Sequence, residues 1–532
     1  MSNSQPKVDW PVFIVAVIII LLCAIPLLIF PKEASQILKD GRDVIMTNFL
    51  WLYLIVGISA FSFCLWLILG RYAHVKLGSP DESPEYSNIH WVSMMFTTAV
   101  GASVIAWGFA EPIFYLQTPP LGIEVGSSKS FEWAHMYPLL HWGIVPWSMY
   151  ALPSVPIAYM LYVRRYPVLR ISSACDGALP KRGRDQIKTI IDILIVLGIV
   201  GGVATSLGLG VPLLSAMLAT LFEIPDNMII KISVLSLWTL LFGASVYRGL
   251  KSGIKVLANI NIVLAIFAIL FVLIAGPGVF IMDLTVNSIG LMFNNFIRTA
   301  TWTDPIQNGS FPEDWTGFYW GWWLAYTGMV GLFFGRISRG RTIRQLVLGV
   351  ICWGSLGTWM FLAVMGGYSL YLENTETLAV SEILTNQGMS YVNALVIKSL
   401  PFGKFTLFIF TLLSIIFYAT TIDSSAYVLS SISAKNLQNG AEPKRWNRVA
   451  WAVLLALISA GIVQTGALDT VLSITVLSSV PLIPILILLS ISLMRWLKKD
   501  FGNIVGPKEI SLALKDVKSD SLASQGEQSN TK

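Results

Sequence analysis

Apolar stretches of about 20 residues recur along the whole chain. Hydrophobic residues make up 55% of its 532 positions, and charged residues make up only 12%, about half of what is usual in soluble domains. A helix of about 20 apolar residues crosses a bilayer, because it satisfies its own backbone hydrogen bonds where no water is present. We therefore predict an all-α membrane protein with twelve transmembrane helices. The twelve windows lie near residues 11–30, 48–70, 90–116, 137–163, 187–221, 229–247, 253–281, 315–335, 346–372, 403–434, 447–466 and 469–494.

The basic residues indicate how these helices are oriented. Lys and Arg gather after the even-numbered windows, although the first odd-numbered loop carries Lys32, Lys39 and Arg42. Loops that stay in the cytoplasm are enriched in Lys and Arg. We therefore predict a multi-pass membrane protein with both termini in the cytoplasm. The net charge of +6 is explained by these loops and does not indicate nucleic-acid binding.

Several classes of function lack their sequence signals. The four cysteines form no CxxC pair, the four histidines show no metal-ligand spacing, and we find no phosphate-binding loop. A channel would need a repeated selectivity loop or a ring of charges, and a membrane enzyme would need a nucleophile–base pair or a metal cluster. We therefore expect no enzyme and no cofactor, and we expect a transporter driven by an ion gradient or by exchange.

A run of aromatic residues at 315–326 reads W-T-G-F-Y-W-G-W-W-L-A-Y. Aromatic faces bind quaternary ammonium groups, which cannot donate a normal hydrogen bond. Helical spacing places Trp320 and Trp323 on one face, and Trp322 and Tyr326 on another. Trp and Tyr also gather in interfacial belts at the level of the lipid headgroups. The run by itself allows both interpretations.

Three other windows contain residues that weaken helices. The third contains T-T-A-V-G-A-S at 97–103, the fourth contains His141-Trp142 followed by Pro146, and the fifth contains 201–210 with four glycines, followed by Pro212. Broken helices are the best sequence indication of a transporter site. The alternative is close helix packing through small residues.

The tenth window carries hydroxyl and carboxyl groups between apolar flanks. Thr420 and Thr421 are adjacent, and Asp423 follows them. Hydroxyls beside freed carbonyls suit a hard cation such as Na⁺, although Thr and Ser also bond back to carbonyls of their own helix. An intramembrane carboxylate is by default functional or tightly paired. This applies to Asp423, and Glu111 is the other acidic candidate.

Five motifs together point to one family. They are D-W-T-G-F-Y-W-G-W-W at 314–323, R-I-S-R-G-R-T-I-R at 336–344, W-G-F-A-E-P at 107–112, the set His141, Trp142, Pro146, Trp147 and Tyr150, and A-T-S-L-G-L-G at 204–210. With these motifs the chain resembles the betaine/choline/carnitine transporter family over roughly residues 8–500.

The resemblance implies a fold of two extra helices followed by two inverted five-helix repeats of the LeuT type, with broken helices meeting at the midplane. It also implies a homotrimer, in which an amphipathic helix, expected here at Leu284–Ala300, contributes to the contact. The expected divisions are an N-terminal cytoplasmic tail (1–10), two peripheral helices (11–89), the first repeat (90–281), the amphipathic interfacial helix and loop (282–314), the second repeat (315–495) and a C-terminal cytoplasmic tail (496–532).

The resemblance further implies the binding residues. The family's aromatic box corresponds to Trp142, Trp147, Tyr150 and Trp323. Trp322 and Tyr326 would line the same pathway, and Trp107 and Phe114 are added as substrate-binding candidates from the third window. The family's Na⁺ site corresponds to the hydroxyls of Thr420 and Thr421, completed by carbonyls near Thr97, Val100 and Phe417.

The chain departs from the family pattern in the third window. Sodium-coupled members have three glycines where this chain has only Gly101 within 99–103, and the Na⁺-independent carnitine exchangers also lack them. Those exchangers carry an Arg and a Met in place of the ions, whereas this chain has Asn261 and Val330. We therefore expect Na⁺-coupled symport of glycine betaine or carnitine. The alternatives are a carnitine/γ-butyrobetaine type exchanger, or a symporter of choline or of a sulfonium such as dimethylsulfoniopropionate. The short tail favours nutritional uptake over osmotic activation.

Overall fold

The computed structural model describes residues 7–99, 101–248, 251–307, 309–435, 437 and 442–502. Its described elements are almost all helical. They begin with β1 (Lys7–Val8), α1 (Trp10–Ile29), α2 (Pro31–Leu69), α3 (Asn88–Ala99), α4 (Ala102–Gly108), α5 (Glu111–Gln117), the 3₁₀ turn η1 (Pro120–Gly122), α6 (Ser128–His141), α7 (Ile144–Tyr162), α8 (Ile171–Ala174), α9 (Arg184–Phe222), α10 (Met228–Arg248), α11 (Lys251–Ala275), α12 (Gly278–Asn294) and α13 (Phe296–Ala300). They continue with the π-helix η2 (Pro312–Gly317), α14 (Phe318–Ile337), α15 (Ile343–Leu348), the π-helix η3 (Gly349–Trp353), α16 (Gly354–Asn374), α17 (Val380–Gln387), α18 (Met389–Ser399), α19 (Gly403–Ile432), β2 (Ala434–Lys435), α20 (Arg445–Thr465), α21 (Leu468–Ser479) and α22 (Leu482–Phe501).

Each of the twelve predicted windows falls on helical segments, which confirms the all-α class. In the described part of the chain, eight helices are long and apolar enough to cross a membrane, or ten if each of two bent pairs is one span. The count of twelve is therefore not confirmed. The predicted windows at 229–247 and 315–335 lie on α10 and α14, which are not among these eight helices. In α14 many of the apolar residues are Trp and Tyr, which are less apolar than Leu or Ile. The expected tails lie mostly outside the described residues.

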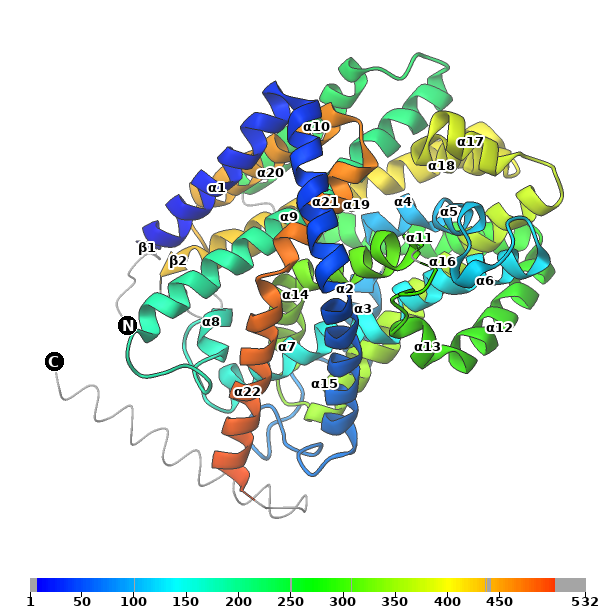
Figure 1. Cartoon of the computed structure of the whole chain (residues 1–532). Helices are drawn as coiled ribbons and strands as arrows, with labels where there is room; N and C mark the ends of the chain where they lie inside the picture. Colours follow the sequence, from blue (N-terminus) through cyan, green and yellow to red (C-terminus); the bar gives the residue numbers. More distant parts are fainter. Residues whose placement is uncertain are drawn as a thin grey trace, which may run out of the picture.

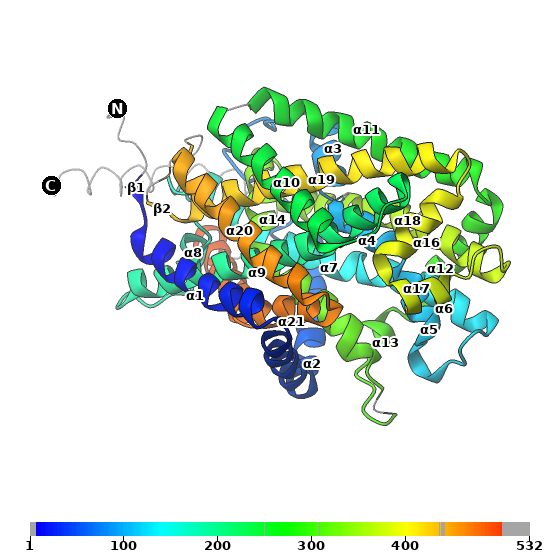
Figure 2. The same ribbon diagram turned by 90° about the horizontal axis from the view of Figure 1, so that it is seen from above.

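Helix α2 begins well before the predicted window at 48–70. It runs from Pro31 to Leu69 because the polar residues 31–47 continue the helix instead of forming the loop we expected. Figures 1 and 2 show α2 on the outside of the bundle, and it packs there against α21 and α7.

The predicted breaks in the third and fourth windows are present. Helix α3 ends at Ala99, and the helix that follows is bent from it by 54°. Helix α6 ends at His141, and α7 starts at Ile144 after a non-helical Trp142–Gly143. The glycine-rich fifth window instead forms one unbroken helix, α9. Its glycines allow close packing, since a Cβ on Gly210 would lie 2.2 Å from the ring of Tyr418.

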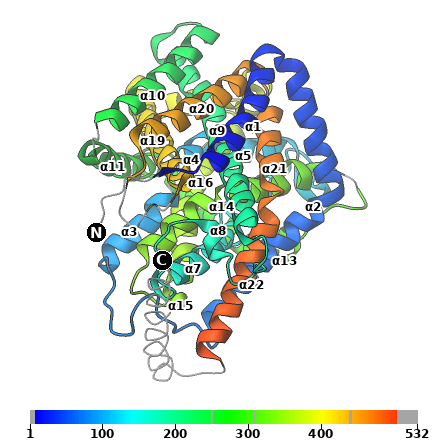
Figure 3. The same cartoon turned by 90° about the vertical axis from the view of Figure 1, so that its left-hand side faces the viewer.

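The helix over the aromatic run has no internal break. Helix α14 is continuous from Phe318 to Ile337, and only its start is irregular, where η2 takes a π-helical form. Figure 3 shows α14 and α7 in the interior of the bundle, where they pack closely on each other. Nearly all of their side chains are buried.

The expected amphipathic helix is present but begins earlier. Helix α11 ends at Ala275, and after Gly276 and Pro277 helix α12 starts at Gly278, bent by 107° from the described part of α11. The short α13 completes the stretch to Ala300. Figure 1 shows α12 beside α6 at the end of the molecule opposite β1 and β2. Helix α12 packs on α6 and α16.

One buried arginine holds the polar start of α2 in place. The Arg42 side chain is only 6% exposed and contacts Asp43 and Asp469, at 3.1 and 3.2 Å, and Asp314 at 3.7 Å. Lys39, one turn earlier, contacts the same Asp469 at 3.2 Å but is 40% exposed. Removing a buried partner leaves charges without compensation, whereas exposed pairs contribute little.

We expect Arg42→Met to lower the free energy of unfolding by about 1–3 kcal/mol, because its hydrogen bonds to Asp43 and Asp469 are lost, while the carboxylates left behind are 38–50% exposed and stay partly solvated. The matched variant Lys39→Met should cost under about 1 kcal/mol. Thermal unfolding of the two purified variants in the same detergent measures the difference. Equal losses would show that Arg42 does not fasten α2 to α21.

Candidate binding site

An internal cavity of about 160 Å³ lies where the broken helices meet α14. In another protein, a cavity of about 150 Å³ is large enough to hold benzene, so this one has room for a small organic group. Five segments contribute its lining. The lining residues are Thr98, Ala99, Gly101, Ser103 and Val104 from the α3–α4 break, Trp142, Trp147 and Tyr150 from the α6–α7 junction, Ser206 from α9, Trp322, Trp323, Tyr326, Met329 and Val330 from α14, and Thr421 from α19.

Four aromatic rings form one wall of this cavity. The ring centre of Trp323 lies 4.6 Å from Tyr150, 5.2 Å from Trp147 and 5.7 Å from Trp142. All four residues are between 1% and 7% exposed. An interfacial belt requires rings at the headgroup level, so these buried rings favour the binding-box interpretation. The structure brings together all four residues of the predicted box.

Helix α14 supplies residues to this wall from two adjacent rows. Trp322, Tyr326 and Met329 follow a helical repeat into the cavity, and Trp323 and Val330 lie beside them. We expected Trp320 and Trp323 to share a helix face. Only Trp323 lines the cavity, because Trp320 points away from it, toward α2. A Cβ on Gly57 of α2 would lie 2.7 Å from Trp320 Nε1.

Protein acceptors satisfy the indole N–H groups of the wall. Trp142 Nε1 donates to Glu111 Oε2 at 2.9 Å, and Trp147 Nε1 donates to the Trp142 carbonyl at 3.1 Å. Trp323 Nε1 donates to the His141 carbonyl at 3.0 Å. Two of these acceptors are carbonyls at the break between α6 and α7. The bonds fix the edges of the rings and leave their electron-rich faces available to a ligand.

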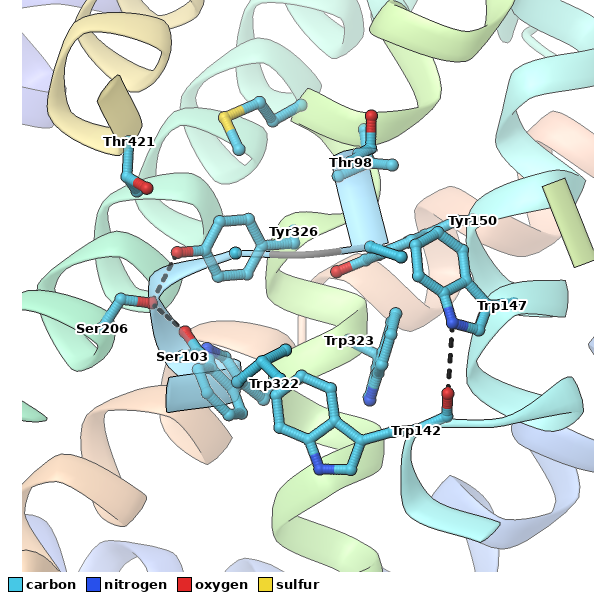
Figure 4. Close-up of a pocket in the computed structure, with 15 residues that line it drawn as sticks. Thr98, Ser103, Trp142, Trp147, Tyr150, Ser206, Trp322, Trp323, Tyr326 and Thr421 are labelled. Carbon is cyan, nitrogen blue, oxygen red and sulfur yellow. Dashed lines mark hydrogen bonds between the residues drawn. The ribbon is translucent and has the colours of Figure 1, made fainter. Parts of the chain in front are cut away.

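Hydroxyl groups lie across the cavity from the aromatic wall. Figure 4 shows Tyr326, Ser206 and Ser103 in a hydrogen-bonded chain, with distances of 2.8 and 3.2 Å between their oxygens, and Thr421 nearby. No Asp, Glu, Lys or Arg is among the lining residues given above. The cavity therefore offers π-faces to a cation at one side and neutral hydrogen-bonding groups at the other.

Two predicted aromatic residues lie outside this cavity. Trp107 is fully buried behind it, with ring centres 5.9 Å from Tyr319 and 6.5 Å from Trp322. Phe114 lines a second cavity of about 360 Å³ together with Pro212 and Tyr391. Neither ring contributes to the wall formed by the four-residue box.

The predicted cation ligands are only partly gathered. Thr420 and Thr421 each donate a hydrogen bond to the Phe417 carbonyl at 2.9 Å. These hydrogen bonds within the helix match the alternative interpretation of the two threonines. They use only the hydroxyl protons, so the oxygen lone pairs can still coordinate a cation. Of the two, only Thr421 lines the cavity. Thr97 Oγ1 donates to the Met94 carbonyl at 3.3 Å, and Val100 lies outside the described residues.

Asp423 has a partner, which the sequence left open. Its carboxylate lies 3.0 Å from Arg448 of α20, so it forms an ion pair and does not line the cavity. Across the described ranges, no group of three or more His, Cys, Asp and Glu residues is placed to hold a metal ion.

Known proteins resemble this chain along almost its full length. A model of the betaine/carnitine/choline family of transporters matches residues 11–502. The chain belongs to this family. It is 34% identical over 446 residues to the uncharacterized transporter YeaV of Escherichia coli K12, an alignment that covers 84% of this chain and 92% of that protein. It is 28% identical over 507 residues to a carnitine transporter of Acinetobacter baumannii ATCC 19606, covering 95% of this chain and 92% of that one.

Sequence reasoning missed several lining residues of this family member. Thr98 and Ser103 lie in the helix-breaking run, but we had not singled them out, and Ser206 lies within a family motif. Met329 also lines the cavity, and its sulfur is 3.7 Å from Ser425 Oγ. Continuing the helical repeat of Trp322 and Tyr326 by one more turn would have found Met329.

A glycine on α9 sets the position of Tyr326. A Cβ on Gly202 would lie 2.9 Å from two ring carbons of Tyr326, so Gly202→Val should push this ring into the cavity. We expect an affinity at least about tenfold weaker for whichever of betaine, carnitine and choline the wild type binds, a loss of about 1.4 kcal/mol.

The matched control for this change is Gly290→Val on α12, where a Cβ would meet nothing within 4 Å. Both variants place a β-branched residue in a helix, so their helix-propensity costs are similar. Binding measured on purified protein distinguishes them. Unchanged affinity in Gly202→Val would mean that Tyr326 does not border the ligand.

Proposed function

We propose that this protein is a secondary active transporter of a quaternary-ammonium zwitterion, of the glycine betaine or carnitine class. The observation that carries the proposal is the cavity walled by Trp142, Trp147, Tyr150 and Trp323. A trimethylammonium group is attracted to aromatic faces by about 0.5–2 kcal/mol per contact. The Acinetobacter relative is a carnitine transporter, and carnitine belongs to the same chemical class.

The two ends of such a zwitterion suit the two sides of the cavity. Its cationic end would lie on the aromatic wall, because no acidic side chain lines the cavity and could bind the cation in its place. Its carboxylate would accept hydrogen bonds from the hydroxyls opposite, among them Ser103 and Tyr326, and from backbone N–H groups at the start of α4. Because α4 follows a break in the helix, its first N–H groups lack partners within the helix.

We further propose that uptake is coupled to Na⁺ by alternating access. The hydroxyl oxygens of Thr420 and Thr421 and carbonyls near Thr97 and Phe417 offer the hard oxygen ligands that a Na⁺ ion needs. An ion held there would tie α19 to α3, and differential affinity for two conformations would let it shift their equilibrium. The bend between α3 and α4 supports a site at this level, because broken helices free carbonyls in transporters.

Exchange without Na⁺ is the second candidate. The sodium-independent exchangers that the chain resembles use a Met on the eighth helix in place of an ion, and Met329 places a thioether in this cavity beside Val330. Asn261 stands where those exchangers have an Arg, so a fixed positive charge is missing. That absence is why we favour Na⁺ coupling.

The proposal also covers the orientation of the protein in its membrane and its oligomeric state. Clusters of Lys and Arg after the even-numbered windows support cytoplasmic termini in an inner membrane. We also propose a homotrimer with α12 in its contact. This helix is bent away from α11, and Val279, Val286 and Phe293 are exposed on it.

The proposal is tested by uptake of labelled glycine betaine, carnitine and choline into proteoliposomes, with and without an inward Na⁺ gradient. Uptake that requires the gradient supports symport. Uptake without Na⁺, seen only when substrate is loaded inside, would replace symport by exchange. Absence of saturable uptake for all three compounds would overturn the proposed substrate class.

We expect Trp323→Leu to weaken binding by roughly 10- to 100-fold, because Trp323 touches the other three rings of the box and each lost cation–π contact is worth about 0.5–2 kcal/mol. Trp51→Leu is the matched control, since Trp51 is an exposed tryptophan on α2. Binding and thermal stability are measured on both variants. Wild-type affinity in Trp323→Leu would remove the box assignment.

Loss of one hydroxyl should specifically affect the ion. We expect Thr421→Ala to raise the Na⁺ concentration for half-maximal uptake at least about tenfold, because one oxygen ligand is lost, a change of about 1.4 kcal/mol. Thr411→Ala on the same helix is the control, because Thr411 is buried and bonds only to Leu407. An unchanged Na⁺ dependence in Thr421→Ala would place the ion elsewhere.

A further inference from the structure

A carboxylic acid lies directly behind the aromatic wall. Glu111 is completely buried, and its Oε2 accepts the hydrogen bond from the indole N–H of Trp142. Within the part of the chain that the structure describes, it has no Lys or Arg within ion-pair distance. Its one ionisable ion-pair neighbour is His141, whose Nδ1 lies 3.7 Å from Glu111 Oε1 and which is also completely buried.

A tyrosine hydroxyl joins these two groups. Tyr115 OH lies 2.7 Å from Glu111 Oε1 and 2.8 Å from His141 Nδ1, and His141 Nε2 lies 3.1 Å from Thr316 Oγ1. The hydroxyl has a single proton and cannot donate to both neighbours. Either His141 donates from Nδ1 while Glu111 only accepts, or a protonated Glu111 donates while His141 Nδ1 accepts. The chain of three groups can therefore carry a proton at either end.

Few other charges face this chain. Tyr137 of α6 lies beside Tyr115 and His141, with ring centres 6.0 and 5.3 Å away, and Tyr319 of α14 stacks on His141 at 4.7 Å. The positive charge of Arg298 of α13 acts on the hydroxyl of Tyr137, and the hydroxyl of Tyr319 faces Glu111. The described residues of α4, α16, α17 and η2 contribute no titratable side chain that is hydrogen-bonded or ion-paired to Glu111 or His141.

The net charge of this network follows from its protons. With Glu111 ionised and His141 neutral, it carries one negative charge on completely buried side chains, which is costly unless a positive charge is near. One added proton removes that charge. A quaternary ammonium in the cavity would supply a positive charge instead, on the far side of the Trp142 ring. The proton and the onium group thus stabilise the same negative charge in alternative ways.

We infer that Glu111, Tyr115 and His141 form a proton-binding site that releases its proton when an onium group occupies the aromatic cavity. The inference rests on the proposed function, because it requires an onium ligand in that cavity. The coupling is reciprocal, so a bound proton weakens onium binding to the same degree that the onium weakens proton binding. If one proton is released per ligand bound, the affinity for the onium rises by up to about tenfold per pH unit. This rise occurs below the pH at which the site of the ligand-free protein is half protonated.

The test is calorimetric titration of the purified full-length protein with glycine betaine, carnitine and choline, between about pH 5 and pH 8. Repeating each titration in two buffers of different ionisation enthalpy counts the protons exchanged. We expect up to one proton released per ligand bound and tighter binding as the pH rises. Glu111→Gln should bind with no proton release and with an affinity that no longer depends on pH. The control Glu124→Gln, at an exposed position, should behave as wild type.

The outcomes separate the two proposals. If none of the three compounds binds, the proposed function fails. If one binds to the wild type without proton release, or with proton uptake, the proton site is overturned and the proposed function stands. Should Glu111→Gln not fold, Tyr115→Phe keeps both titratable groups and removes only the bridging hydroxyl. It should move the midpoint of the pH profile, and an unchanged midpoint would overturn the assignment to this chain of groups.

Discussion

The binding cavity depends on where its buried indole N–H groups find acceptors. A buried donor without an acceptor costs about 1–3 kcal/mol, and Trp142, Trp147 and Trp323 each lie where a protein oxygen accepts their N–H. The break between α6 and α7 provides such oxygens, because the carbonyls of His141 and Trp142 accept from Trp323 and Trp147. The interrupted helix thus does more than bend the chain. It orients two rings of the box and leaves their faces toward the cavity.

Thr358 on α16 is hydrogen-bonded to the same α6–α7 junction. Its hydroxyl donates to the Trp142 carbonyl at 2.5 Å and lies 3.4 Å from Trp147 Nε1. Helix α16 also packs on α3 and α4, so one helix contacts both broken segments that border the site. A movement of α16 relative to α7 would disturb the ring positions and the α3–α4 bend together. This gives a physical route by which a conformational change could alter the aromatic cavity and the residues proposed to hold Na⁺ at once.

The sequence allowed prediction of the helical class and of the breaks in the third and fourth windows, because apolar length and helix-breaking residues act locally. The four box residues followed only from the resemblance to the transporter family. It could not show that α14 lacks a break, or that Trp320 faces α2 and not the cavity, since both depend on tertiary neighbours such as Gly57. Helical spacing alone gave relative directions without saying which direction was inward. The partner of Asp423 was likewise out of reach, because Arg448 comes from another helix.

Charge balance links the cavity to the groups around it. The lining itself is neutral, so a zwitterionic ligand would bring both its charges into a site that has no fixed counter-charge. Glu111 and His141 stand behind the aromatic wall, next to Trp142, and the hydroxyl of Thr421 lies at the opposite side of the cavity. If Glu111 is ionised, its charge would favour an onium at the aromatic wall, and a cation beside the hydroxyls would favour a carboxylate near them. On the proposed function, the two ends of the cavity would then set the orientation of the ligand before any direct salt bridge is made.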